Sequence, residues 1–127
     1  MKQPVDLARR FLLLAERDFK AFRKLADDPE MDDAVIGFHA QQAVEKCLKA
    51  VLALHRVEIR KTHDLRELQT LLEKNRLPMT PMTEEIKDLN PYAVMLRYDD
   101  VESETLDRVR ARRTVEGILA WAKALIK

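Results

Sequence analysis

Apolar residues recur three or four positions apart along most of this chain, which is the period of an amphipathic helix. The first such stretch starts at Pro4, a residue suited to the first turn of a helix, and runs to about Leu25. Residues 27–29, with the sequence Asp-Asp-Pro, end it, and the next stretch spans about Asp33 to His55. The pattern therefore predicts two long helices in the first half of the chain.

The second of these helices carries a wide apolar arc, so we expect it to be the central and most buried helix. At about 100° per residue, the arc contains Ile36, Ala40, Ala43, Val44, Cys47, Leu48, Ala50, Val51 and Leu54. The opposite side, which we expect to be more exposed to solvent, contains His39, Gln42, Lys46 and Lys49. Gln41 and Glu45 project between the two sides, which places them at the edge of the core.

Two shorter helices are predicted next. Thr62 or Asp64 is a suitable cap for a third helix that carries leucines on one side and ends near Lys74. Two prolines then enforce a turn, and a fourth helix is expected from Thr83 to Leu89, before Pro91.

A last long helix is predicted from near Ser103 or Glu104 to about Ile126, after an irregular connector over residues 92–101. Its inward stripe contains Ala111, Val115, Ile118, Ala122 and Leu125, flanked by Leu119 and Trp121. The predicted fold is all-α, an antiparallel four- to five-helix up-and-down bundle in a single domain over residues 1–127. Its first two helices and its C-terminal helix are long, and its third and fourth helices are short.

The composition agrees with one helical domain and argues against a strong overall charge. Of 127 residues, 46% are hydrophobic, 35% are charged and only two are glycine. The 23 lysines and arginines against 22 acidic residues leave a net charge of +1. Any nucleic-acid site must therefore be a local patch of positive charge.

The sequence shows no export or membrane signal. The apolar run after Arg9 and Arg10 is only five residues long before Glu16, and no run of about 18 apolar residues exists. The one cysteine, Cys47, has no partner for an internal disulfide, and its apolar neighbours predict a buried, inert thiol. We therefore expect a cytoplasmic protein that does not associate with membranes.

Polar residues interrupt the apolar pattern of the second helix and predict a site or a specific contact. The spacing of Gln41, Gln42, Glu45, Lys46 and Lys49 puts amides and charges on adjoining faces of one helix. Such groups along a groove could read a base edge or a phosphate. The alternative is that Gln41 and Glu45 bond to an adjacent helix or loop, because buried polar groups need partners.

Two further motifs lie in loops, where functional groups are commonly presented. His63 and Asp64 precede the third helix, as either a cap and packing motif or part of a site. Arg97 and Tyr98 precede the last helix, and Arg97 would bind a phosphate or pair with Asp99 or Glu45. The cations of the last helix, Arg108, Arg110, Arg112, Arg113 and Lys123, do not share one face, which favours solvation or dimer contacts.

Several common chemistries find no support in the sequence. Neither Gly37 nor Gly117 belongs to a phosphate-binding loop, and the three histidines lack metal-ligand spacings. The only serine, Ser103, has the position of a helix cap. We therefore expect no metal, no cofactor and no serine nucleophile.

Together, the polar positions of the second helix, the segment Lys61 to Leu65 and the pair Arg97-Tyr98 resemble the HEPN family over nearly the whole chain. The resemblance implies a helical bundle that assembles as a two-fold dimer. It also implies one of two roles. The first is a binding module for a nucleotide or RNA that partners a small nucleotidyltransferase in a toxin-antitoxin-like or resistance-like system.

The second role is a metal-independent ribonuclease, in which an arginine and a histidine with four to six residues between them converge at the dimer cleft. Counting from Arg97, positions 102 to 104 hold Glu, Ser and Glu, so this motif is absent there. Arg56 and His63 have the spacing but straddle the turn between the second and third helices, and we treat it as coincidence.

The leading hypothesis is therefore the homodimeric binding module. Its ligand-binding residues would be Gln41, Gln42, Glu45, Lys46, Lys49, His63, Asp64, Arg97 and Tyr98. The alternative is a ribonuclease in which His63 or His55 is the general base and Arg97 stabilises the transition state. A third reading is a scaffold without a ligand.

Overall fold

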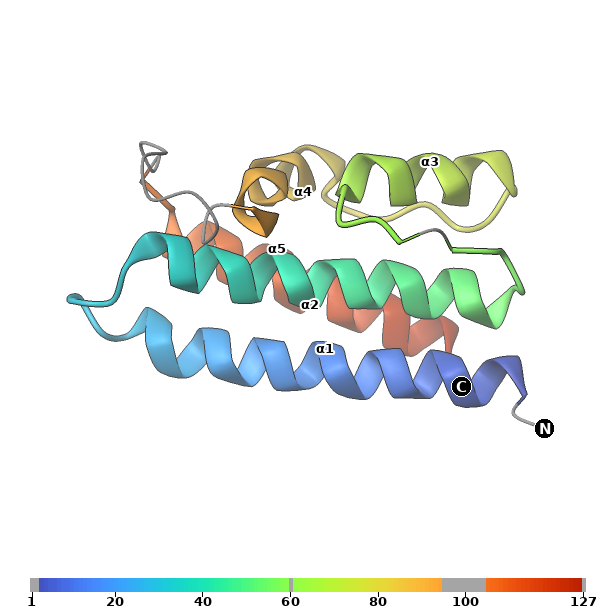
Figure 1. The fold of residues 1–127 in the computed structure, drawn as a ribbon, viewed down its shortest axis with the longest axis horizontal. Helices are drawn as coiled ribbons and strands as arrows, with labels where there is room; N and C mark the ends of the chain where they lie inside the picture. Colours follow the sequence, from blue (N-terminus) through green and yellow to red (C-terminus); the bar gives the residue numbers. More distant parts are fainter. Residues whose placement is uncertain (1–2, 60, 95–104, 127) are drawn as a thin grey trace.

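The computed structural model describes residues 3–59, 61–94 and 105–126, which form helices joined by short connectors (Figure 1). The elements are α1 (Pro4–Ala26), α2 (Asp33–Leu54), α3 (Leu65–Lys74), α4 (Thr83–Leu89), the 3-10 helix η1 (Asn90–Ala93) and α5 (Arg108–Leu125). The all-α prediction is confirmed, and the bounds of α1 to α4 agree with the expected ones to within about one residue.

The helices are arranged around α2. Figure 1 shows α1 alongside α2 in the opposite direction, α3 and α4 on the other side of α2, and α5 behind it. An ion pair between Asp33, the first residue of α2, and Arg108, the first residue of α5, places the starts of these two helices together. Consequently α2 and α5 run in the same direction, and both are antiparallel to α1.

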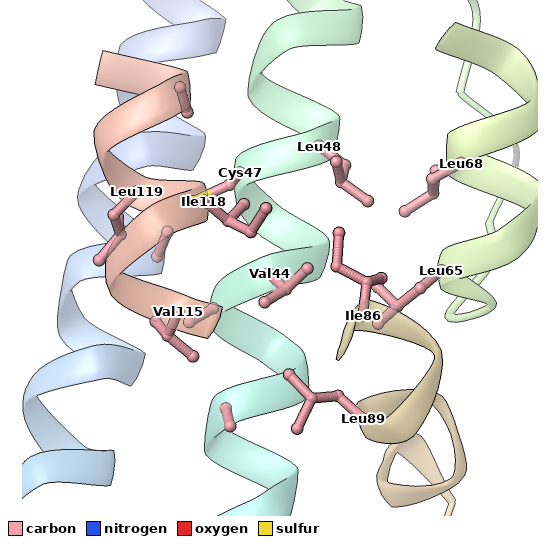
Figure 2. Packing of buried hydrophobic residues seen from close by; sticks show 14 of the residues in the cluster. Val44, Cys47, Leu48, Leu65, Leu68, Ile86, Leu89, Val115, Ile118 and Leu119 are labelled. Carbon is pink, nitrogen blue, oxygen red and sulfur yellow. The ribbon is translucent and has the colours of Figure 1, made fainter. Parts of the chain in front are cut away.

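The core lies on both sides of α2 (Figure 2). From α2, Val44, Cys47 and Leu48 point between the neighbouring helices. Val115 and Ile118 of α5 meet them on one side, and Leu65, Leu68, Ile86 and Leu89 of α3 and α4 meet them on the other, while Leu119 of α5 lies toward α1. This confirms α2 as the central helix. Burial raises the pKa of the Cys47 thiol to about 12, with Glu16 adding to the shift and Lys123 opposing it.

The start of α5 differs from the prediction. Ser103 and Glu104 lie outside the described residues, and residues 105–107 are not helical. The helix begins at Arg108 because the side chain of Asp107 accepts a hydrogen bond from the backbone N–H of Arg110, at 3.0 Å. An aspartate in this position satisfies a donor that the first turn would leave unpaired.

Arg108 binds the turn between α1 and α2. Its Nε donates to Asp33 Oδ1 at 3.0 Å. Its two terminal nitrogens donate to three backbone carbonyls, those of Ala26, Asp28 and Met31, at 2.7 to 3.0 Å. The carbonyl of Ala26 lies in the last turn of α1, where backbone carbonyls lack a partner within the helix, and those of Asp28 and Met31 lie in the turn that follows. One guanidinium therefore joins the end of α1 to this turn.

We expect Arg108→Lys to lower the free energy of unfolding by about 1–3 kcal/mol, because a single ammonium cannot reproduce the planar fork of donors and leaves carbonyls unpaired. Urea unfolding followed by circular dichroism measures the change. Arg112→Lys is the matched control, since Arg112 is exposed and pairs only with Glu116 of its own helix. Equal stability of the two variants would contradict the role of Arg108 in holding the turn between α1 and α2.

Gly37 provides space for an aromatic ring. A Cβ atom at this position of α2 would lie 2.3 Å from Cδ1 of Tyr92, a buried residue of η1. Only glycine lets the ring rest directly on the helix backbone. This contact fixes η1, and with it the segment on which part of the candidate site is built.

Candidate functional site

A buried carboxylate, that of Glu45, is the centre of a polar cluster on α2. Its side chain is 3% exposed. Oε1 accepts hydrogen bonds from Gln41 Nε2 at 3.1 Å and from His63 Nδ1 at 3.0 Å. Oε2 accepts from Lys49 Nζ at 3.0 Å. Three donors, one of them an ammonium, therefore compensate a charge that would be costly to bury alone.

Gln41 ties the connector between α2 and α3 to the same cluster. Its Nε2 also donates to the backbone carbonyl of His63 at 3.0 Å, and its Oε1 accepts from Gln42 Nε2 at 2.7 Å. The interpretation that Gln41 and Glu45 bond to a neighbouring loop is thus confirmed. Both side chains lie deeper than the predicted edge of the core, because the connector covers them.

His63 is held by this cluster and faces solvent. Its side chain is 54% exposed although Nδ1 is bonded to Glu45. A carboxylate at Nδ1 favours the proton on that nitrogen, which leaves the lone pair of the neutral ring on Nε2. Within the described ranges, Nε2 has no hydrogen-bond partner. The imidazole is therefore oriented from one side and available on the other.

His63 lines an open hollow of about 710 Å³ between the α2–α3 connector, α3 and η1. Three cations also line it: Lys61, Arg66 and Lys87. Arg66 Nε lies 3.7 Å from Asp64 Oδ1, and Lys87 Nζ lies 3.2 Å from Glu84 Oε1. Both ion pairs are exposed. The hollow combines a histidine with loosely paired positive charge, an arrangement that suits a phosphate or another small anion.

Asp64 fixes one wall of this hollow. Its carboxylate caps α3 by accepting from the backbone N–H of Arg66 at 2.9 Å, and it accepts from Asn90 Nδ2 at 2.9 Å. Asn90 Oδ1 in turn accepts from the backbone N–H of Leu65 at 2.8 Å. Partial burial opposes ionisation, but the hydrogen bonds from Asn90 and the Arg66 backbone outweigh it, and the pKa of Asp64 falls below its usual 3.8.

We expect Asp64→Ala to lower the free energy of unfolding by about 0.5–2 kcal/mol at neutral pH, since the helix loses its cap. A lowered pKa means that the ionised form stabilises the fold above pH 3.8, and that this part is lost as the pH falls through the folded value. Thermal unfolding from pH 7 to pH 3 measures it. Asp64→Asn keeps the cap without the charge, so its difference from wild type should shrink as the pH falls below 3.8. A constant difference would contradict the assignment.

The remaining predicted site residues lie elsewhere. Lys46 donates to Asp18 of α1, which also accepts from His39 Nδ1 at 3.1 Å, so Lys46 belongs to a separate α1–α2 contact. Arg97 and Tyr98 lie outside the described residues. His55, the capping residue at the end of α2, does not line the hollow beside His63.

Arg56 lines a different hollow from His63. It lies beside the start of α1, with Pro4, Leu7 and Phe11. The structure therefore does not bring this arginine and His63 into one site, in agreement with the interpretation of their spacing as coincidence.

The sequence pattern missed three polar residues of the hollow, Arg66, Lys87 and Asn90. Arg66 lies in the first turn of α3, while Lys87 and Asn90 belong to α4 and η1, which Tyr92 holds against α2 at Gly37. Asn90 precedes Pro91, and the sequence pattern predicts only a helix break at this pair. An asparagine before a proline at a predicted helix end was the one available signal, because asparagine amides often bond to nearby backbone.

The described part of the chain shows neither a cluster of metal ligands nor a membrane-spanning helix. No group of three His, Cys, Asp or Glu side chains there is arranged to hold a metal ion. In the same ranges, every helix is too short or too polar to cross a lipid bilayer.

The fold and the polar cluster define a small helical bundle with a potential anion site. The family model of the HEPN domain matches residues 8–125, and the chain therefore belongs to the HEPN domain family. A comparison with curated proteins gave no match, and neither did a comparison with solved structures. Family membership supports RNA binding or RNA cleavage, and HEPN domains commonly form dimers.

Proposed function

We propose that this protein is a homodimeric binding module whose hollow beside His63 binds a phosphate group of RNA or of a nucleotide. The observation that supports this proposal is the position of the His63 imidazole. The buried Glu45 holds it at the wall of a hollow that three cations also line. Gln41, Gln42 and Lys49 support this arrangement from within the fold, and Asp64 fixes the start of α3.

The cations of the hollow are free to exchange partners. Exposed ion pairs such as Arg66 with Asp64 and Lys87 with Glu84 are worth about 0–1 kcal/mol each. Charge-assisted hydrogen bonds to phosphate are roughly twice as strong as neutral ones, and an arginine forms two of them in parallel. A bound phosphate therefore outweighs the existing pairs, and Lys61 has no ion pair to break within the described ranges.

Arg97 and Tyr98 complete the proposed site. Val94 lines the hollow, and Arg97 follows it by three residues, which span at most about 11 Å of extended chain. This short separation in sequence is the reason to propose that Arg97 contacts a phosphate bound beside His63. Tyr98 would supply a ring for stacking on a base.

Calorimetry with AMP, ATP and an eight-nucleotide oligouridylate tests the binding proposal. We expect binding by the wild-type protein and a clear loss of affinity in Lys61→Gln/Lys87→Gln. Lys74→Gln/Arg10→Gln removes the same charge outside the hollow and should bind normally. Absence of heat with all three ligands, in a protein shown to be folded, would overturn the proposal.

A metal-independent ribonuclease is the second candidate, and the Glu45–His63 pair favours it. A carboxylate that orients an imidazole through Nδ1, with Nε2 free, is the arrangement of a general base. Arg97 would then stabilise the charge of the transition state. Incubation with mixed RNA and a chelator tests this candidate. Cleavage that is lost in both His63→Ala and Arg97→Ala would support it, and cleavage retained in both would exclude these residues.

The proposed partners are a second copy of the chain and a small nucleotidyltransferase. The dimer is supported by the dimers that HEPN domains commonly form. The transferase is supported by the resemblance to two-component systems. Light scattering after gel filtration measures the oligomeric state. Co-purification with any small nucleotidyltransferase encoded beside this chain measures the second contact, and a monomer that binds no such protein would remove both partners.

A further inference from the structure

A second concentration of positive charge lies on the opposite side of α2 from His63, between α1 and α5. We call it the α1–α5 basic hollow. It has a volume of about 390 Å³ and is lined by Lys20, Arg23, Lys24, Asp27 and Arg112. This local excess of four cations over one carboxylate contrasts with the net charge of only +1 for the whole chain. It shares no residue with the hollow beside His63.

The charges in this hollow are largely uncompensated. Lys20 and Lys24 form no ion pair or hydrogen bond within the described ranges. Arg112 pairs only with Glu116 of its own helix, at 3.2 Å, and this pair is exposed. Arg23 and Lys24 lie in the last turn of α1, where the helix dipole favours cations, but this dipole does not account for the additional positive charge of Lys20 and Arg112.

An aromatic platform adjoins these cations. The guanidinium of Arg23 lies over the ring of Phe19, 5.0 Å from its centroid, and Phe19 stacks on the buried Phe22 with centroids 6.2 Å apart. Phe19 also lines a neighbouring hollow of about 600 Å³, together with Lys20 and Arg23. A partly exposed ring and a guanidinium plane are surfaces on which unpaired bases stack.

We infer that this face binds single-stranded RNA. Lys20, Lys24 and Arg112 contact the phosphates, while Phe19 and Arg23 stack on bases. A basic groove with an interleaved aromatic ring is the combination used for single strands, whereas aspartate and glutamate side chains have no ring to stack on the platform. This inference concerns a separate surface and does not depend on phosphate binding beside His63.

Fluorescence anisotropy with a fluorescein-labelled 12-nucleotide oligouridylate tests the phosphate contacts. Lys20→Gln/Lys24→Gln should weaken binding and reduce the salt slope by about 1.4, since each phosphate contact to a single strand contributes about 0.7. Arg9→Gln/Arg10→Gln removes the same charge from the same helix, at least about 15 Å away, beyond the screening length of about 8 Å. An equal loss in both double variants would overturn the inference.

Phe19→Leu tests the platform while keeping the position apolar. We expect it to weaken oligouridylate binding by about 5- to 150-fold, the effect of losing one stacked base, and to leave binding of inorganic polyphosphate unchanged. Competition by polyglutamate as strong as that by RNA would overturn the inference in favour of an acidic protein. RNA binding that is lost only in Lys61→Gln/Lys87→Gln would also overturn it, while leaving the proposed function intact.

Discussion

Val51→Asp is expected to lower the free energy of unfolding by at least about 3 kcal/mol, a large part of the roughly 5–15 kcal/mol that stabilises a typical domain. Val51 is 0% exposed and lies in the apolar arc of α2, where neighbouring helices leave no water or partner for a carboxylate. Urea unfolding followed by circular dichroism measures the loss. Where the variant is unfolded without denaturant, the circular dichroism spectrum itself gives the result.

The matched control is Val109→Asp. It makes the same chemical change on α5, at a side chain that is 63% exposed, and should alter stability by no more than about 0.5 kcal/mol. Similar unfolding midpoints for the two variants would contradict the central position of α2.

Glu45→Leu is the second large effect, with an expected loss of about 3 kcal/mol. Removing one partner of a buried pair leaves the other charge without compensation, which typically costs 3–5 kcal/mol. We expect the lower end of this range because the Lys49 side chain is 14% exposed and its ammonium can reach water. Gln41 keeps its bond to the His63 carbonyl, but the imidazole of His63 loses its anchor. We therefore also expect weaker ligand binding in the hollow.

The double variant Glu45→Leu/Lys49→Met separates charge from anchoring. Replacing both members of a buried pair by apolar residues is often nearly neutral, so much of the lost stability should return. Ligand binding should not return, because His63 remains unanchored. Calorimetric binding and urea unfolding of the same samples give both quantities. Recovery of both together would show that Glu45 acts on the fold alone.

The sequence was sufficient for most of the fold, because its helices are bounded by local signals. Pro4 begins α1, Asp-Asp-Pro ends it, and Asn90-Pro91 ends α4. The start of α5 was predicted too early, since an N-terminal cap is chosen among several candidates by the surrounding structure, and Asp107 is the one used. The hydrogen bonds of Arg108 to backbone carbonyls were not predictable, because sequence periodicity contains no information on which distant turn lies beside a helix.

The candidate site was predicted less completely. Helical spacing placed Gln41 and Glu45 together, and the structure joins both to His63. The same spacing gave no way to separate Lys49, which binds Glu45, from Lys46, which binds Asp18 of another helix. The direction of a side chain follows from the helix, but its partner follows from tertiary packing. The assignments to Arg97 and Tyr98 stay predictions.

The close contact of Gly37 with Tyr92 has a consequence for how this domain can diverge. Glycine inside a helix costs roughly 0.5–1 kcal/mol relative to alanine, so drift at position 37 should favour larger residues. The ring at position 92 blocks that drift, because even a methyl group would meet it at 2.3 Å. Among relatives, the two positions should therefore covary, with alanine or serine at 37 appearing only where 92 carries a smaller side chain.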